Sequence, residues 1–219
     1  MVKRGTLSLQ RIVGTATGLL DRNGVDKFSM RRLAAEIGVD PMALYHHVPN
    51  RAALMRELVR VFLQGCEFPA PRGTWQTRVR AFCRAFRGQA QRHPGLFIVY
   101  SRSDDWSAEY LKLEDSLYAA LADAGFAPKA RVRAGRLLLA YTENFALWEL
   151  SGWIASYSEE ERADFADNLA EGDFPAVAAL AAHITDIDPD AEFEFGLDVA
   201  IRGLEAGLSR RTSRKGRRS

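Results

Sequence analysis

The sequence predicts an all-α protein, in which a small N-terminal domain precedes a larger helical domain. Apolar residues recur at helical spacing along the chain, as Ile12, Ala16 and Leu19 illustrate. Alternating apolar and polar segments bounded by Asn-Gly or Asp-Gly turns, which would favour strands, do not occur. With 219 residues and a 47% apolar share, the chain is long enough to bury a core in each of two such domains.

The first two helices are delimited by caps. A helix over residues 8–22 is expected between a cap at Ser8 and a stop at Gly24. A shorter helix then opens at Ser29 and closes at Gly38, where glycine tolerates the turn conformation.

Prolines delimit the third helix. Asp40 is expected to cap it and Pro41 to occupy its first position, because proline lacks the N–H that this position leaves unpaired. Pro49 ends this helix near residue 48, and Asn50 caps the next one.

The second and third helices have the pattern of a helix-turn-helix. Two helices that cross closely need a small residue in the first, here Ala34, and a glycine in the turn, here Gly38. Leu44 and Val48 lie one turn apart and are expected to face the core. The opposite side then carries Met42, Tyr45 and His46, and such an exposed short helix is what reading a DNA major groove requires.

The larger domain follows a segment rich in proline and glycine, residues 67–74. A helical stripe runs from Trp75 to Phe86. Further helices are expected at about 95–101, 105–124, 128–150, 159–170, 174–184 and 190–208, with a capping box at Ser158 and Glu161. The predicted division is 1–66 for the helix-turn-helix domain with its connecting helix, 67–208 for the helical domain, and 209–219 for a basic disordered tail.

Charge is distributed unevenly. Residues 1–64 carry ten basic and five acidic side chains, whereas residues 100–208 carry eight basic and 22 acidic ones. One end of the chain is therefore suited to a polyanion, which charge alone would leave as DNA or a membrane surface.

Several function classes are not expected. The chain shows no signal peptide and no apolar run long enough to span a membrane, so we expect a cytoplasmic protein without a membrane partner. Cys66 and Cys83 lack metal-binding spacing and are expected to be reduced and buried. No nucleophile–base constellation, metal-ligand spacing or phosphate loop is present, so neither an enzyme nor a bound cofactor or metal is expected.

The segment RIVGTATGLLDRNGVDKFSMRRLAAEIGVDPMALYHHVPNRAAL resembles the DNA-binding domain of the tetracycline-repressor (TetR/AcrR) family of transcription regulators. GVDPMALYHHVPN is closest to the tetracycline-repressor branch, and FEFGLDVAIRGLEAGL, residues 193–208, is similar to the last helix of that branch's ligand-binding domain. The resemblance implies an all-helical homodimer that binds double-stranded DNA at a palindromic operator, with a small-molecule inducer in the larger domain.

The resemblance also implies a set of DNA contacts. The family pattern puts Met30 and Arg31 at a phosphate or base edge and His47 and Arg51 near phosphates. The remaining residues, along the groove or at its bases and backbone, are Pro41, Met42, Ala43, Tyr45 and His46.

Each contact has a structural alternative. Tyr45 would otherwise be a buried packing aromatic, and His46 a solvated surface histidine. Met42 would pack on Tyr45 or on a thymine methyl. Asp40 departs from the small hydroxyl residue common in the family, and because a carboxylate repels phosphate we expect it to cap the helix instead.

An aromatic stripe on the 128–150 helix has two interpretations. Leu138, Tyr141, Phe145 and Trp148 share one face, which on general grounds is core, whereas the resemblance favours the wall of the inducer cavity. Nearby polar candidates for the same cavity are His93, Glu143 and Asn144.

The last helix carries small residues along one face. Gly196, Ala200, Gly203 and Gly207 recur at helical spacing, and glycine costs a helix about 1 kcal/mol relative to alanine. Our hypothesis is that this face joins residues 128–150 in a dimeric four-helix bundle, and the alternative is close packing inside one subunit. The basic tail would either stay disordered or add non-specific DNA affinity.

These observations predict a ligand-responsive transcriptional regulator of the repressor type, released from its operator by a small hydrophobic or aromatic molecule. The alternative is a DNA-binding regulator with no small-molecule effector, controlled by a protein partner.

Overall fold

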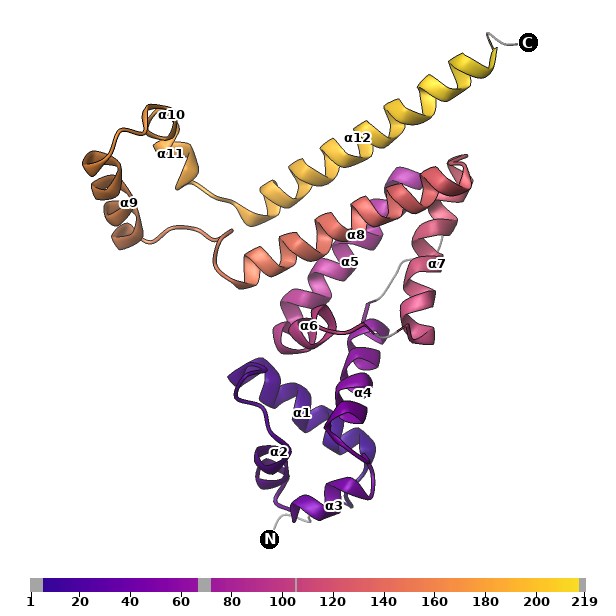
Figure 1. Ribbon diagram of the computed structural model, residues 1–219, viewed down its shortest axis with the longest axis vertical. Coiled ribbons are helices and arrows are strands. Elements are labelled where there is room, and N and C mark those ends of the chain that lie inside the picture. Colours follow the sequence, from indigo (N-terminus) through magenta and orange to yellow (C-terminus); the bar gives the residue numbers. More distant parts are fainter. Residues whose placement is uncertain (1–5, 67–71, 105, 217–219) are drawn as a thin grey trace. The chain divides into compact units, whose positions relative to one another are not determined.

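The computed structural model describes residues 6–66, 72–104 and 106–216, and these residues form helices and no strands (Figure 1). The predicted all-α class is therefore confirmed. Part of the predicted hinge, residues 67–71, lies outside the described residues.

The helices fall close to the predicted ranges. In the first half they are α1 Leu9–Asn23, α2 Met30–Ile37, α3 Pro41–Tyr45, α4 Arg51–Gln64, α5 Trp75–Arg92 and α6 Pro94–Ser101. They continue as α7 Ala108–Asp123, α8 Pro128–Leu150, α9 Glu159–Glu171, α10 Pro175–Ala178, α11 Ala181–Ile184 and α12 Pro189–Gly216.

The predicted caps of the helix-turn-helix are confirmed. The Ser29 hydroxyl accepts a hydrogen bond from the third residue of α2, and Gly38 ends that helix at φ 80° in the left-handed region. A carboxylate oxygen of Asp40 accepts from the Met42 amide at 2.7 Å, as expected of a cap. The Asn50 side chain does the same for α4, accepting from the Ala53 amide at 2.8 Å.

Packing fixes the orientation of α3. Leu44 and Val48 are buried, and so is Ala34 where α2 passes α3, all as predicted. The helix is shorter than expected, however, because it ends at Tyr45 and the amides of His47 and Val48 both donate to the carbonyl of Leu44. Val48 thus anchors the chain from the turn after the helix.

Two elements near the C-terminus differ from the prediction. The segment expected as one helix over 174–184 forms two single-turn helices, α10 and α11. Helix α12 continues to Gly216, so the chain is helical well into the tail that was expected to be disordered. That tail has no proline or glycine before Gly216, and nothing in it forces the helix to stop earlier.

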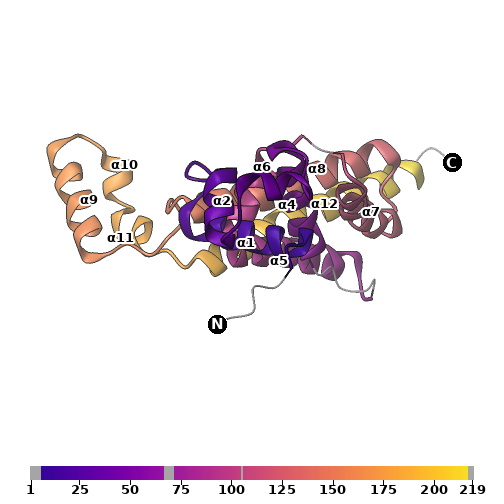
Figure 2. The same cartoon turned by 90° about the horizontal axis from the view of Figure 1, so that it is seen from below.

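The chain divides into two compact units, residues 1–143 and 144–219, which we describe separately. In the first unit α6 packs against both α1 and α4, and α4 also packs against α7. Figure 2 shows α1, α2 and α4 together in this unit, seen from below.

An aromatic cluster is the core where α4, α5 and α6 meet. The ring of Phe62 lies 5.5 Å from Phe86, 5.7 Å from Phe97 and 5.1 Å from Tyr100. The three phenylalanines have essentially no exposed surface. We call these four residues the Phe62 cluster, and it joins the last turn of α4 to the start of the larger helical domain.

The second unit has a small core and much exposed apolar surface. Phe145 at the end of α8 packs edge-on against Phe193 of α12, with ring centres 5.1 Å apart. Helix α9 has no buried residue, and α9, α10 and α11 gather in a group of their own in both Figure 1 and Figure 2. Its capping box, Ser158 with Glu161, forms as predicted.

Candidate nucleic-acid interface and ligand cavity

The outward side of α3 is exposed, as its periodicity predicts. Met42 keeps 66% of its surface accessible and Tyr45 39%. His46 and His47, in the turn after the helix, are exposed as well. The reading of Tyr45 as a buried packing residue is therefore wrong.

Cations flank this surface on the neighbouring helices. Arg31 in the first turn of α2 and Arg51 at the start of α4 are both exposed. Pro41 and Ala43 are half-buried, so they present a part of their surface along α3. These positions form one candidate surface for a nucleic acid, because phosphate contacts come from exposed cations and hydroxyls.

Met30 does not fit the expectation drawn from the family pattern. Only 8% of its surface is exposed, and it belongs to the core side of α2 with Leu33 and Ala34. Its neighbour Arg31 lies about 100° further around the helix and is exposed. The side chain of Met30 is thus a packing residue, which corrects its assignment to the DNA surface.

A cavity of about 300 Å³ lies in the first unit beside the Phe62 cluster. We call it the aromatic cavity, and its lining comes from α4, the end of α6, the loop that follows, α7 and α8. The residues are Val59, Tyr100, Ser101, Ser103, Asp104, Trp106, Tyr110 and Glu143. Its aromatic members include Trp106 and Tyr110, whose rings pack edge-to-face at 5.4 Å. Flat aromatic molecules suit such a lining.

A partly buried hydrogen bond joins two residues that line the aromatic cavity. The Tyr100 hydroxyl donates to a carboxylate oxygen of Glu143 at 2.6 Å. Burial raises the pKa of the Glu143 carboxyl above its ordinary value of 4.5, although the hydrogen bond from Tyr100 opposes this. Burial and the nearby Glu143 charge likewise raise the pKa of the Tyr100 phenol, and burial raises the pKa of Tyr110 to about 12.

The ligand residues expected from sequence do not line this cavity. Leu138 is fully buried, Phe145 packs on Phe193, and Trp148 is 60% exposed at the end of α8. Tyr141 is half-buried and Asn144 exposed. The core interpretation therefore holds for Leu138 and Phe145, and of the polar candidates only Glu143 lines the aromatic cavity.

His93 serves another contact. Its Nδ1 lies 3.0 Å from a carboxylate oxygen of Asp21 on α1, and the other oxygen accepts from the Gly95 amide at 2.9 Å. A side chain at Gly95 would overlap the backbone of Leu20, so α6 approaches α1 closely only because this residue is glycine.

Two glycines of the small-residue face of α12 have space beside them. A Cβ added at Gly203 or Gly207 would meet no atom within 4 Å, and both residues are exposed. Gly196 and Ala200 are half-buried. Beside them Phe195 and Val199 expose most of their apolar surface.

The described residues do not show the features of a metal site or a membrane span. Within the described ranges, no three His, Cys, Asp or Glu side chains are grouped so that they would hold a metal ion. Cys66 and Cys83 are both buried, as predicted. No helix in the described part of the chain is both long and apolar enough to cross a bilayer.

We predict that Glu143→Gln stabilises the protein at neutral pH. A raised pKa means that the native state binds the Glu143 proton more tightly than the unfolded chain, so stability falls as pH rises above 4.5. Glutamine avoids the buried charge and can still accept from Tyr100. The free energy of unfolding should rise by on the order of 1 kcal/mol at pH 7 and change little at pH 4. An equal change at both pH values, measured by denaturant unfolding, would contradict this.

Family profiles match both parts of the chain. The profile described as "Bacterial regulatory proteins, tetR family" matches residues 12–58. The profile described as "Tetracyclin repressor-like, C-terminal domain" matches residues 68–208.

Individual relatives agree with these profiles. The chain is 27% identical to the HTH-type transcriptional repressor DrrR1 of Streptomyces coeruleorubidus over 94% of this chain and 80% of that protein. It is also 27% identical to the class D tetracycline repressor of Escherichia coli, covering 93% of this chain and 91% of the relative. The crystal structure of the Streptomyces coelicolor protein ActR in complex with actinorhodin superposes with a TM-score of 0.79 at 31% identity, covering 93% of this chain and 99% of ActR.

The two profiles, which together account for most of the chain, agree with the exposed α3 and the helical second domain. The protein belongs to the TetR family of bacterial regulatory proteins, which are DNA-binding transcription factors and not enzymes.

Proposed function

We propose that the protein is a repressor that binds a palindromic operator as a homodimer and leaves it when a small aromatic molecule enters the aromatic cavity. The observation that carries the DNA-binding part is α3 itself. Its inner side is held by the buried Leu44 and Val48, while Met42 and Tyr45 stay exposed and take no part in the core. An exposed helix held in this way fits a major groove.

Each exposed residue has a proposed role at the operator. Tyr45 and His46 contact backbone and bases, and Met42 offers an apolar surface to a thymine methyl. Pro41 and Ala43 lie along the groove. The exposed cations and hydrogen-bond donors at Arg31, His47 and Arg51 contact phosphates.

The homodimer is proposed to form through α12 and α8. The open glycines Gly203 and Gly207 let a partner helix approach closely, and the exposed Phe195 and Val199 supply apolar surface for it to cover. Gly196 and Ala200 continue the same small-residue face. Two copies of α3 would then meet two half-sites of a palindrome.

The effector is proposed to be a flat aromatic compound. Trp106, Tyr110 and Tyr100 provide its stacking surfaces, and Glu143 accepts or donates a hydrogen bond depending on its protonation. The related protein ActR has been crystallised with actinorhodin. Actinorhodin is therefore the first compound to test as an effector of this protein. Because Val59 belongs to α4, a molecule in the aromatic cavity touches the helix that connects to the reading surface.

A combined experiment tests this proposal. A genomic pull-down with footprinting should give a palindromic site, and fluorescence anisotropy on that site should show release by actinorhodin or another member of an aromatic panel. Sedimentation should show a dimer that Gly203→Leu weakens, since leucine occupies the space reserved for the partner helix.

The outcomes separate the alternatives. If operator binding occurs but no aromatic compound raises the melting temperature or releases DNA, the effector part of the proposal fails and control by a protein partner is favoured. An undisturbed Gly203→Leu dimer would contradict the proposed interface, and a footprint without two-fold symmetry would contradict binding as a dimer.

We predict that Arg31→Gln weakens operator binding through loss of one phosphate contact. Because each phosphate contact releases counterions, the slope of log affinity against log salt should fall in magnitude by about 1 per subunit. The matched control is Arg162→Gln on α9, also an exposed arginine but outside the helix-turn-helix. Equal salt slopes for wild type and Arg31→Gln in anisotropy titrations would argue against a phosphate role for Arg31.

A further inference from the structure

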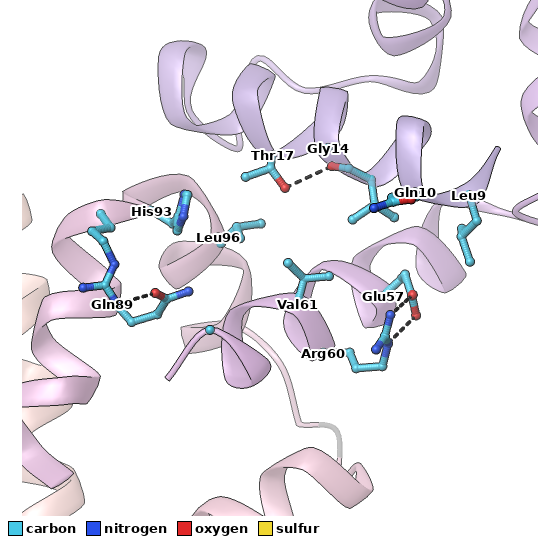
Figure 3. Close-up of a pocket in the computed structure, with 13 residues that line it drawn as sticks. Leu9, Gln10, Gly14, Thr17, Glu57, Arg60, Val61, Gln89, His93 and Leu96 are labelled. Carbon is cyan, nitrogen blue, oxygen red and sulfur yellow. Dashed lines mark hydrogen bonds and ion pairs between the residues drawn. The ribbon is translucent and has the colours of Figure 1, made fainter. Parts of the chain in front are cut away.

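A second cavity, of about 1060 Å³, lies in the first unit where α1 and α4 meet the junction of α5 and α6 (Figure 3). We call it the joint groove, and it shares no lining residue with the aromatic cavity. The residues that define it here are Val13, Gly14, Val61, Gln89, Arg92 and Leu96. A groove of this size is large enough for a drug-sized molecule.

One wall of the joint groove is fixed by a buried amide. Gln89 is only 4% exposed, and its Nε2 donates to the carbonyl of Phe62 at 3.3 Å. Its Oε1 accepts a hydrogen bond from the Arg92 guanidinium at 2.8 Å. Gly65 makes this possible, because any side chain there would overlap the Gln89 amide. The guanidinium of Arg92 is therefore held in place before any molecule binds.

A second part of the groove is fixed by the contact between α1 and α6 next to His93. Asp21 binds the His93 ring and the Gly95 amide together, and the missing side chain of Gly95 lets the two helices touch. Because hydrogen bonds between different helices hold both parts of the lining, the groove is pre-formed, and ordering it costs a ligand little conformational entropy.

The charges in the groove do not cancel. Arg60 is paired with Glu57 on the same helix, with one hydrogen bond at 2.9 Å. In the described parts of the chain Arg92 has no carboxylate partner, since its bond goes to the neutral Gln89 amide. The Cys66 thiol is close enough for the Arg92 charge to lower its pKa, but burial has the larger effect and raises that pKa to about 12. The thiol is therefore neutral and does not compensate the charge of Arg92. One positive charge is left for an incoming anion.

Apolar side chains form another part of the lining, beside the polar Gln10 and Thr17. Val13, Val61 and Leu96 line the groove, and Leu9 at its edge is 40% exposed. A Cβ at Gly14 would meet no atom within 4 Å, so the backbone of α1 is bare at this point. A flat apolar body can lie against this surface while its charged end reaches Arg92.

We propose that the joint groove is a second small-molecule site, which binds a flat apolar carboxylate with its carboxylate on Arg92. Such a molecule touches α1 and α4 of the DNA-binding part and α5 and α6 of the larger domain at once. It therefore favours one arrangement of these helices and, by linkage, changes operator affinity independently of the aromatic cavity.

Isothermal titration calorimetry of the full-length protein with 2-naphthoate tests the site, with neutral 2-naphthamide as the matched ligand. Naphthoate should bind the wild type, and the amide should bind about tenfold more weakly because it loses the charge-assisted hydrogen bond. Arg92→Gln should weaken naphthoate by a similar factor. Arg84→Gln, which changes an exposed arginine of α5 outside the groove, should leave it unchanged.

Blocking the groove is a second arm. Gly14→Phe places a ring in the open space over α1, so it should abolish naphthoate binding while the melting temperature shows that the protein is folded. The proposal is overturned if the wild type does not bind naphthoate measurably. It is also overturned if either Arg92→Gln or Gly14→Phe binds naphthoate with the wild-type affinity. Loss of binding only with Trp106→Ala, in the aromatic cavity, also overturns it. None of these readings involves DNA, so they are independent of the proposed repressor function.

Discussion

Phe62 packs without exposed surface among Phe86, Phe97 and Tyr100, and this contact makes α4 a member of two cores at once. The first turns of α4 bury Leu54 and Leu58. Its last turn is held in the Phe62 cluster. Because both ends of α4 are packed in cores, a movement of one end must change the packing at the other end. Close-packed interiors allow such changes only in discrete steps. Within the first unit, α4 therefore links the packing of the DNA-binding part to the packing of α5 and α6.

Both cavities of the first unit border this helix. The aromatic cavity takes Val59 from α4 and Tyr100 from the Phe62 cluster, whereas the joint groove takes Val61 and the Glu57–Arg60 pair. The contact of α1 with α6 through Asp21 and Gly95 is a second tie between the same parts. A molecule in either cavity would therefore contact α4, which packs against α1. Helix α1 in turn packs against α2, and α2 packs against α3.

The sequence predicted what depends on local chemistry. Caps at Ser29, Asp40 and Asn50 and the burial of Leu44 follow from hydrogen-bonding groups and periodicity, which act within one helix. It did not predict the aromatic cavity, because Val59, Tyr100 and Glu143 come from segments that are far apart in the sequence and meet only in the folded chain. The apolar stripe on α8, Leu138 to Trp148, did not locate the cavity, since residues of a core and residues of a cavity wall recur with the same helical periodicity. Met30 was misplaced because the family pattern gives a position on α2 and not the direction of its side chain.

Amide hydrogen exchange, measured by mass spectrometry with and without operator DNA, tests the central claim that the Phe62 cluster couples the reading surface to the aromatic cavity. Coupling is reciprocal, so DNA bound at α3 must alter the cavity. In the wild type, operator should change exchange in the peptides that carry Tyr100 and Tyr110 as well as in α1–α3. In Phe62→Leu, the change should be confined to α1–α3. A wild-type response confined to α1–α3 would contradict the account.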